Sequence, residues 1–243
     1  MTGQTASIKL NPKRILIFLL VMVGVIVGLS IWGQKIRFFG IADIRGPWHE
    51  FLLDQLMQNF YLDAEGNITT YINALLLFIP ALLLAAISSW KISVKDKFRF
   101  NWVGLALIFF FLSIDEAAVI HENMIKPMRA IAGAEGFFYF AWVIPGMVIV
   151  AIFGLVYLLF FLHLDRKFKI LFLVSLAVYI GGVIGGEMIS GYYASLLGQK
   201  NFTYAVVASL EESIEYIGCS LIIYSLLKYI EHYLPEGITF RVL

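Results

Sequence analysis

Acidic side chains and one histidine interrupt three of the most apolar stretches of this chain. Residues 113–122 read SIDEAAVIHE and follow directly on the run WVGLALIFFFL. Further on, an acid follows a glycine-rich stretch, and three more acids lie within ASLEESIEY. Carboxylates with a single histidine are ligands suited to Fe(II), Mn or Zn. The candidate ligands are Asp115, Glu116, His121, Glu122, Glu187, Glu211, Glu212 and Glu215.

The overall composition explains why these residues stand out. Of the 243 residues, 60% are hydrophobic and only 14% are charged, and the mean hydropathy is +0.86. Soluble domains are nearer half apolar and a quarter charged, so the chain is expected to be an integral membrane protein. A net charge of +1 without a basic block argues against a nucleic-acid partner. The single cysteine, Cys219, excludes an internal disulfide and a multi-cysteine metal site.

Six apolar runs are long enough to cross a bilayer as helices, so the sequence predicts an all-α fold of about six spans in one domain, 1–243. The runs are 14–33, 70–90, 102–122, 137–163, 170–190 and 203–228. Between the first two, GPWHEFLLDQLMQNFYL places Phe51, Leu52 and Leu56 near one helical face. This segment is expected to be an amphipathic helix on the outer surface.

Loop charges predict the orientation, because cytoplasmic loops carry an excess of Lys and Arg. With both termini inside, twelve basic residues fall on the cytoplasmic side: Lys9, Lys13, Arg14, Lys91, Lys95, Lys97, Arg99, Arg166, Lys167, Lys169, Lys228 and Arg241. Six fall outside: Lys35, Arg37, Arg45, Lys126, Arg129 and Lys200. This topology places all the candidate acids in the outer half of the membrane or near its middle.

The buried acids need neutralisation. Each costs about 2.5–3.5 kcal/mol at the bilayer centre, so seven unpaired acids cost about 20 kcal/mol, more than a typical domain's net stability. The apolar stretches that carry them contain no Lys or Arg apart from Lys228, at the cytoplasmic end of the sixth run. Protons, bound cations or basic side chains from the outer segments must therefore compensate the charge.

Helical geometry limits which side chains can meet. Glu211, Glu212 and Glu215 share one stripe of the sixth span. On a regular third span, Asp115 and Glu122 share a face, while Glu116 and His121 point to opposite sides. The sequence therefore predicts Asp115, Glu122 and one flanking residue as ligands, unless the helix is distorted there.

Two resemblances bear on this pattern. The ligand inventory is similar to that of ferritin-like di-iron and di-manganese carboxylate proteins, but no Glu stands three residues before His121, so the resemblance is chemical only. SIDEAAVIHE, the later glycine-rich acid-bearing helix and ASLEESIEYIG together resemble a group of uncharacterised polytopic bacterial membrane proteins, over about residues 70–230. That resemblance implies a bacterial inner membrane and no function.

Three functional hypotheses remain. The first is a membrane enzyme whose metal ions, Fe or Mn before Zn, activate oxygen or water against a lipid-soluble substrate from the outer leaflet. The second is a proton- or cation-coupled transporter that uses the same acids. The third is a structural subunit of a membrane protein complex, with protonated acids hydrogen-bonded between helices.

Overall fold

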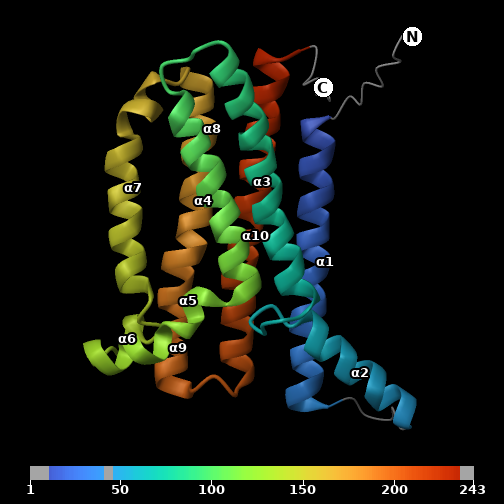
Figure 1. Ribbon diagram of the computed structural model, residues 1–243. Coiled ribbons are helices and arrows are strands. Elements are labelled where there is room, and N and C mark those ends of the chain that lie inside the picture. Colours follow the sequence, from blue (N-terminus) through green and yellow to red (C-terminus); the bar gives the residue numbers. More distant parts are fainter. Residues whose placement is uncertain (1–10, 41–45, 236–243) are drawn as a thin grey trace.

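The computed structural model describes residues 11–40 and 46–235 and is shown in Figure 1. Every regular element within these ranges is helical, which confirms the predicted all-α class. Three of the basic residues used to predict the orientation, Lys9, Arg45 and Arg241, lie outside the described residues.

Five helical stretches are long and apolar enough to cross a membrane, which indicates an integral membrane protein. They are α1 (Pro12–Phe39), α3 (Ile68–Ser93), α4 (Arg99–Ala118), α7 (Val143–His163) and the continuous stretch Arg166–Leu197. This last stretch is built from α8 (Arg166–Ile180), a π-helical segment (Gly181–Gly186) and α9 (Glu187–Leu197). The sequence prediction of 170–190 was therefore too short for it.

The sixth predicted span is α10 (Phe202–Tyr233), a helix of 32 residues. It is long enough to cross, but its acids make it less apolar than the other five stretches. It runs the length of the bundle and packs against α1, α3 and α8 (Figure 1). Its buried residues lie along most of its length, from Tyr204 to Tyr229. α10 is thus the central helix, shielded by its neighbours.

The two ends of the bundle differ in charge. Pro12 and Tyr233 lie at the same end, which we name the inner end, together with the α3–α4 and α7–α8 connections (Figure 1). Basic residues at the inner end are Lys13, Arg14, Lys91, Lys95, Lys97, Arg99, Arg166, Lys167, Lys169 and Lys228. The opposite, outer end has fewer: Lys35, Arg37, Lys126, Arg129 and Lys200. This distribution is the one expected if the inner end faces the cytoplasm.

The outer end departs from the predicted spans. The third span was predicted to continue to residue 122, but α4 ends at Ala118 because Val119 adopts a left-handed conformation with φ 56°. Two short helices follow, α5 (Ile120–Asn123) and α6 (Ile125–Ala132). The fourth span was predicted from residue 137, but a 3₁₀ turn occupies Gly136–Phe138 and α7 starts at Val143.

The helix predicted between the first two spans is present as α2 (Pro47–Phe60), with its proline in the first turn. It lies at the outer end and projects away from the bundle (Figure 1). None of its residues is buried, and Trp48, Phe51 and Leu52 are exposed. Its position on a membrane surface stays a prediction.

Candidate functional site

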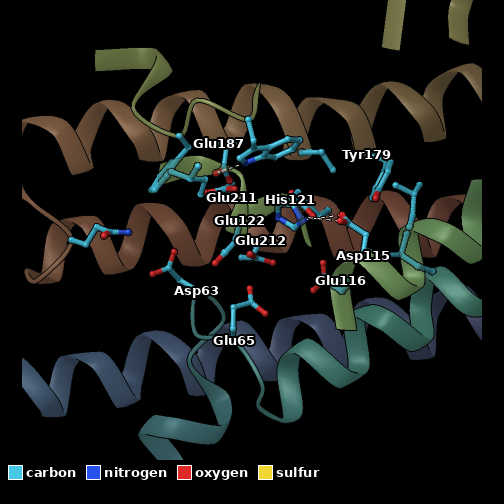
Figure 2. Close-up of a pocket in the computed structure, with 18 of the residues that line it drawn as sticks. Asp63, Glu65, Asp115, Glu116, His121, Glu122, Tyr179, Glu187, Glu211 and Glu212 are labelled. Atoms are coloured by element: carbon cyan, nitrogen blue, oxygen red, sulfur yellow. Dashed lines mark hydrogen bonds and ion pairs between the residues drawn. The ribbon is translucent and has the colours of Figure 1, made fainter. Parts of the chain in front are cut away.

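One cavity of about 170 Å³ lies near the outer end of the bundle, between α3, α4, α8, α9 and α10. Figure 2 shows the acidic side chains that surround it. All eight residues predicted from the sequence line this cavity, together with Asp63 and Glu65, which sequence reasoning missed. The lining therefore contains nine carboxyl groups and one histidine, without a lysine or arginine among its described residues.

The break after α4 brings its acids and histidine together. Asp115 and Glu116 lie in the last turn of α4, and the turn at Val119 folds the chain back. The backbone N–H of His121 donates to Asp115 Oδ1 at 3.0 Å, and the His121 ring Nδ1 lies 2.8 Å from Asp115 Oδ2. The helix is therefore distorted at Val119, which is the condition under which the sequence allowed more than one flanking residue to join Asp115 and Glu122. The distortion lets all four line the cavity.

Glycines of the π-helical segment allow α10 to approach closely. A Cβ added at Gly186 would lie 2.5 Å from Glu211 Cγ, and one at Gly182 would lie 2.8 Å from Glu215 Cγ. Either distance is far shorter than a normal carbon–carbon contact. Gly181 and Gly185, in the same segment, have no such neighbour within 4 Å. The lack of side chains at Gly182 and Gly186 is thus needed for the α10 acids to lie against the π-helical segment. Such π-helical turns often occur at functional sites.

Glu187, at the start of α9, and the three acids of α10 differ in the groups that their carboxyl groups contact. Glu187 Oε1 accepts a hydrogen bond from Trp142 Nε1 at 3.0 Å, and its carboxyl group also contacts that of Glu211. Glu211 is only 6% exposed. Glu212 and Glu215 line the cavity, and neither side chain has a hydrogen-bond partner within the described part of the chain.

Asp63 and Glu65 come from the connection between α2 and α3. Asp63 accepts hydrogen bonds from Tyr204 at 2.8 Å and from Tyr61 at 2.9 Å, so it is anchored to α10. In the sequence, both acids belong to the polar stretch DAEGN, which resembles an ordinary exposed loop. The signal available was Asn67, whose side chain caps α3 and fixes where this connection ends.

The acids contributed by the outer connections resist ionisation. Burial raises the pKa of Asp63 to about 7. Burial and the neighbouring charge of Glu116 raise the pKa of Glu65 to about 7. Burial and the charge of Glu65 raise the pKa of Glu122 to about 7. Glu65 and Glu122 also share a side-chain hydrogen bond, which requires one of them to carry a proton.

His121 is the one basic group among the described residues that line the cavity. Burial alone would lower its pKa, but the hydrogen bond to Asp115 and the surrounding carboxylates raise its pKa to about 9. An imidazolium paired with Asp115 leaves eight carboxyl groups without a positively charged side chain in the lining.

The carboxyl groups surround the cavity but do not converge on one point. Within residues 11–40 and 46–235, no three His, Cys, Asp or Glu side chains stand in a metal-ligating arrangement. Side-chain rotations into the cavity would be needed before several oxygens could contact one ion.

Comparison with known proteins gives one match. The profile of a family described as "Domain of unknown function (DUF8692)" matches residues 14–229. That range contains the entire cavity lining. No curated protein and no solved structure matches the chain significantly.

Proposed function

We propose that this chain, which belongs to the DUF8692 family, is a membrane enzyme that binds divalent metal ions in its outer acidic cavity. The observation that carries the proposal is the cavity lining, nine carboxyl groups with a single basic residue, His121. Its substrate would be a lipid-soluble molecule that reaches the cavity from the outer leaflet.

Electrostatics supports a bound cation. Protons neutralise some of the charge, because the pKa values of Glu65 and Glu122 are raised to about 7. Glu212 and Glu215 have no hydrogen-bond partner among the described residues, and both line the cavity. A divalent ion between them would compensate both charges and supply the missing contacts.

The chemistry of the lining favours particular metals. Many carboxylates with one histidine suit Mn or Fe(II) better than Zn, whose sites use more nitrogen and sulfur ligands. The number of acids exceeds the needs of one ion and would accommodate two. When bound, such a metal would supply Lewis-acid activation of oxygen or water.

The position of α10 supports a six-span arrangement. Its acids make it too polar for a lipid-exposed helix, but Glu211, Glu212 and Glu215 face the cavity and not the lipid. With α10 as the sixth span, Pro12 and Tyr233 lie on the same side, as in Figure 1. The basic inner end would then face the cytoplasm of a bacterial cell.

The inner half of the bundle favours an enzyme over a carrier. A transporter would need polar side chains along a route from the acidic cavity to the inner end. A second, deeper cavity among the described residues is lined by apolar side chains alone, including Phe109, Phe160 and Phe172. Trp102, which also lines this cavity, packs against the ring of Tyr229, with centroids 4.8 Å apart.

The test is metal content, measured by mass spectrometry on protein purified in mild detergent without chelators or a metal-affinity column. The proposal predicts stoichiometric Mn, Fe or Zn, lost in a Glu212→Gln, Glu215→Gln double variant. The matched control is Glu231→Gln, because Glu231 is exposed at the inner end beside Lys228. Absence of metal from the wild-type protein and both variants would mean that the acids hold protons, and a carrier or a structural subunit would replace the enzyme.

A further inference from the structure

The second cavity lies beneath the acidic one and has the opposite chemistry. It is lined by residues of α3, α4, α7, α8 and α10, and all these side chains are apolar. Its volume is about 30 Å³. A cavity needs about 10–15 Å³ in this measure to hold one water molecule. The apolar cavity therefore has room for a few carbon atoms of one hydrocarbon chain and not for two chains side by side.

The two cavities lie along the same faces of the same helices. On four helices, a residue that lines the acidic cavity lies seven positions from one that lines the apolar cavity. Such pairs are Leu77 and Leu84 on α3, Leu112 and Leu105 on α4, Tyr179 and Phe172 on α8, and Glu215 and Ile222 on α10. Seven residues make nearly two turns, so both members point the same way, about 10 Å apart along the axis.

On α4 and α8, some residues that line the two cavities are only one helical turn apart. Phe109 lines the apolar cavity and Leu112, one turn further along α4, lines the acidic cavity. On α8, Leu176 and Tyr179 have the same relation. One helical turn is about 5 Å, so the floor of the acidic cavity is also the roof of the apolar one.

We propose that the two cavities together form the binding site of a single-chain amphiphile. Its oxygen-bearing headgroup occupies the acidic cavity, and the adjoining part of its hydrocarbon chain passes Leu112 and Tyr179 into the apolar cavity. The headgroup position rests on the proposed function, because the oxygen would ligate the bound metal. The chain position rests only on the register and apolar lining of the deeper cavity.

Helix α7 is the wall through which such a chain can reach the site from the bilayer. Its buried residues are Val143, Tyr157 and Phe160. Leu155 and Leu159, on its other side, are 76% and 70% exposed. A span held by so few buried side chains is easily displaced, and Phe160 of this span lines the apolar cavity.

The experiment uses a photoreactive long-chain alcohol with a diazirine near the middle of its chain, added to the full-length protein in detergent. After irradiation, labelled peptides are mapped by mass spectrometry. The proposal predicts labelling of α4 and α8 at Phe109, Phe172 or Leu176, removed by excess unlabelled alcohol. Leu176→Trp fills the cavity and should reduce this labelling at least tenfold. Leu173→Trp is the matched control, because Leu173 lies on the same helix and is 51% exposed.

Three outcomes would overturn the amphiphile site: labelling confined to exposed α7 positions such as Leu155, labelling unchanged in Leu176→Trp, or equal labelling by a two-chain photoreactive phospholipid. Melting temperatures of both variants check that folding is retained. If Leu176→Trp does not fold, Ile222→Phe, which adds a smaller volume to the opposite wall, replaces it.

Metal content of the same samples separates this inference from the proposed function. If Leu176→Trp retains its metal but loses the labelling, the result supports both the proposed function and the amphiphile site. Specific labelling in a protein that contains no metal would leave the chain site standing and refute the metal-dependent headgroup contact.

Discussion

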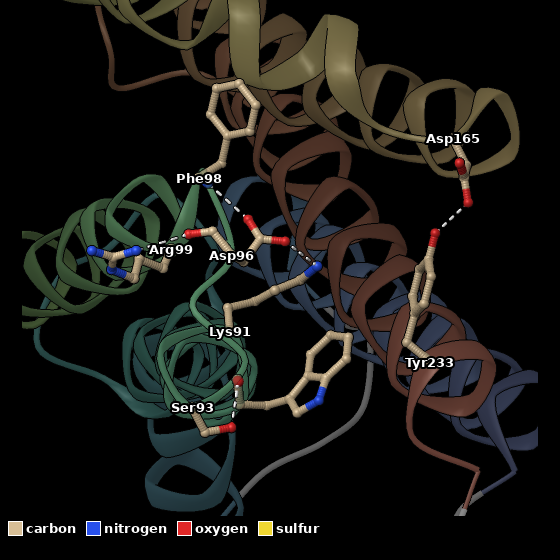
Figure 3. A network of polar contacts seen from close by, with 8 residues as sticks. Lys91, Ser93, Asp96, Phe98, Arg99, Asp165 and Tyr233 are labelled. Atoms are coloured by element: carbon tan, nitrogen blue, oxygen red, sulfur yellow. Dashed lines mark hydrogen bonds and ion pairs between the residues drawn. The ribbon is translucent and has the colours of Figure 1, made fainter.

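The inner and outer ends of this bundle treat acidic side chains in opposite ways. At the inner end, Lys91 Nζ donates to Asp96 Oδ2 at 2.8 Å, and the backbone N–H of Phe98 donates to Asp96 Oδ1 at 2.7 Å (Figure 3). Asp165 accepts a hydrogen bond from Tyr233 in the same region. Around the outer cavity, nine carboxyl groups share one histidine (Figure 2).

The difference appears in how readily the acids ionise. Burial acts to raise the pKa of Asp96, but the hydrogen bonds from Lys91 and the Phe98 N–H outweigh it, so that pKa lies below its usual range. Burial and neighbouring carboxylates raise the pKa of Glu122 to about 7. A protein that can pair its acids at one end has not done so at the other. This contrast is what suggests that the outer acids serve a ligand and not the fold.

The largest expected effect is a difference in the sign of the stability change: a substitution at the inner end should lower the stability, and one in the outer cavity should raise it. Lys91→Met should destabilise the protein by about 1.5–3 kcal/mol, because it removes a charged hydrogen bond and leaves Asp96 without its cation. Glu215→Gln should stabilise the metal-free protein, because it removes one of nine carboxyl groups that repel one another around the cavity. Thermal unfolding after treatment with chelator measures both. Destabilisation by both substitutions would mean that Glu215 is already satisfied within the fold.

The second prediction concerns the π-helical segment against which the α10 acids lie. Gly186→Ala should cost about 1–3 kcal/mol and lower metal content, because the new Cβ would overlap Glu211 Cγ. Gly185→Ala, one residue away in open space, should be neutral or stabilising by up to about 1 kcal/mol. Melting temperatures and metal analysis of the two variants provide the comparison. Equal effects of the two substitutions would show that the close approach is unimportant.

The third prediction concerns pH. Asp63, Glu65 and Glu122 have pKa values raised to about 7, so the folded state retains protons that the unfolded state releases above about pH 4. The pKa of His121, raised to about 9, adds stability that is lost as the pH rises toward 9. The melting temperature of the metal-free protein should therefore fall by several degrees between pH 5 and pH 9.

Differential scanning fluorimetry across that range checks the slope, and Glu122→Gln should flatten it between pH 5 and pH 7. The inner-end acid Asp96 contributes in the other direction and only at low pH, because the stability from its lowered pKa is lost below about pH 4. A melting temperature that rises with pH from 5 to 9 would contradict the acid-rich description of the cavity.

The smallest expected effect comes from Trp142, which donates to Glu187 at 3.0 Å and whose ring lies 4.8 Å from that of His121. Trp142→Phe keeps one aromatic six-membered ring but removes the indole N–H donor, so it should cost about 1 kcal/mol. Trp48→Phe, on the exposed α2, should leave the melting temperature unchanged. If Trp142→Phe lowers the stability much more than Gly186→Ala does, Trp142 lies at the centre of the site.

The sequence predicted the members of the cavity better than their arrangement. Acids inside apolar runs are costly in a membrane, so Glu187 and Glu211 could be assigned to a shared site from their positions in the sequence alone. The turn at Val119 was missed because neither glycine nor proline marks it, and a β-branched residue is among those least expected at positive φ.

Asp63 and Glu65 were missed for a different reason. A polar connection between helices carries no periodic pattern, so the sequence does not indicate whether it folds inward or outward. Tertiary contacts decide the question here, since Tyr61 and Tyr204 hold Asp63 over the cavity. The length and apolar character of the spans depended on composition alone and could be predicted, whereas the folding of the outer connections could not.

The most direct test of a metal in the outer cavity is an anomalous difference map from crystals of protein purified without chelators. We predict a peak at the Mn, Fe or Zn absorption edge inside the cavity, about 2.0–2.2 Å from side-chain oxygens of Glu212 or Glu215. A cavity containing only water, with carboxyl groups paired at hydrogen-bonding distances, would contradict the proposal and leave protons as the counter-charge.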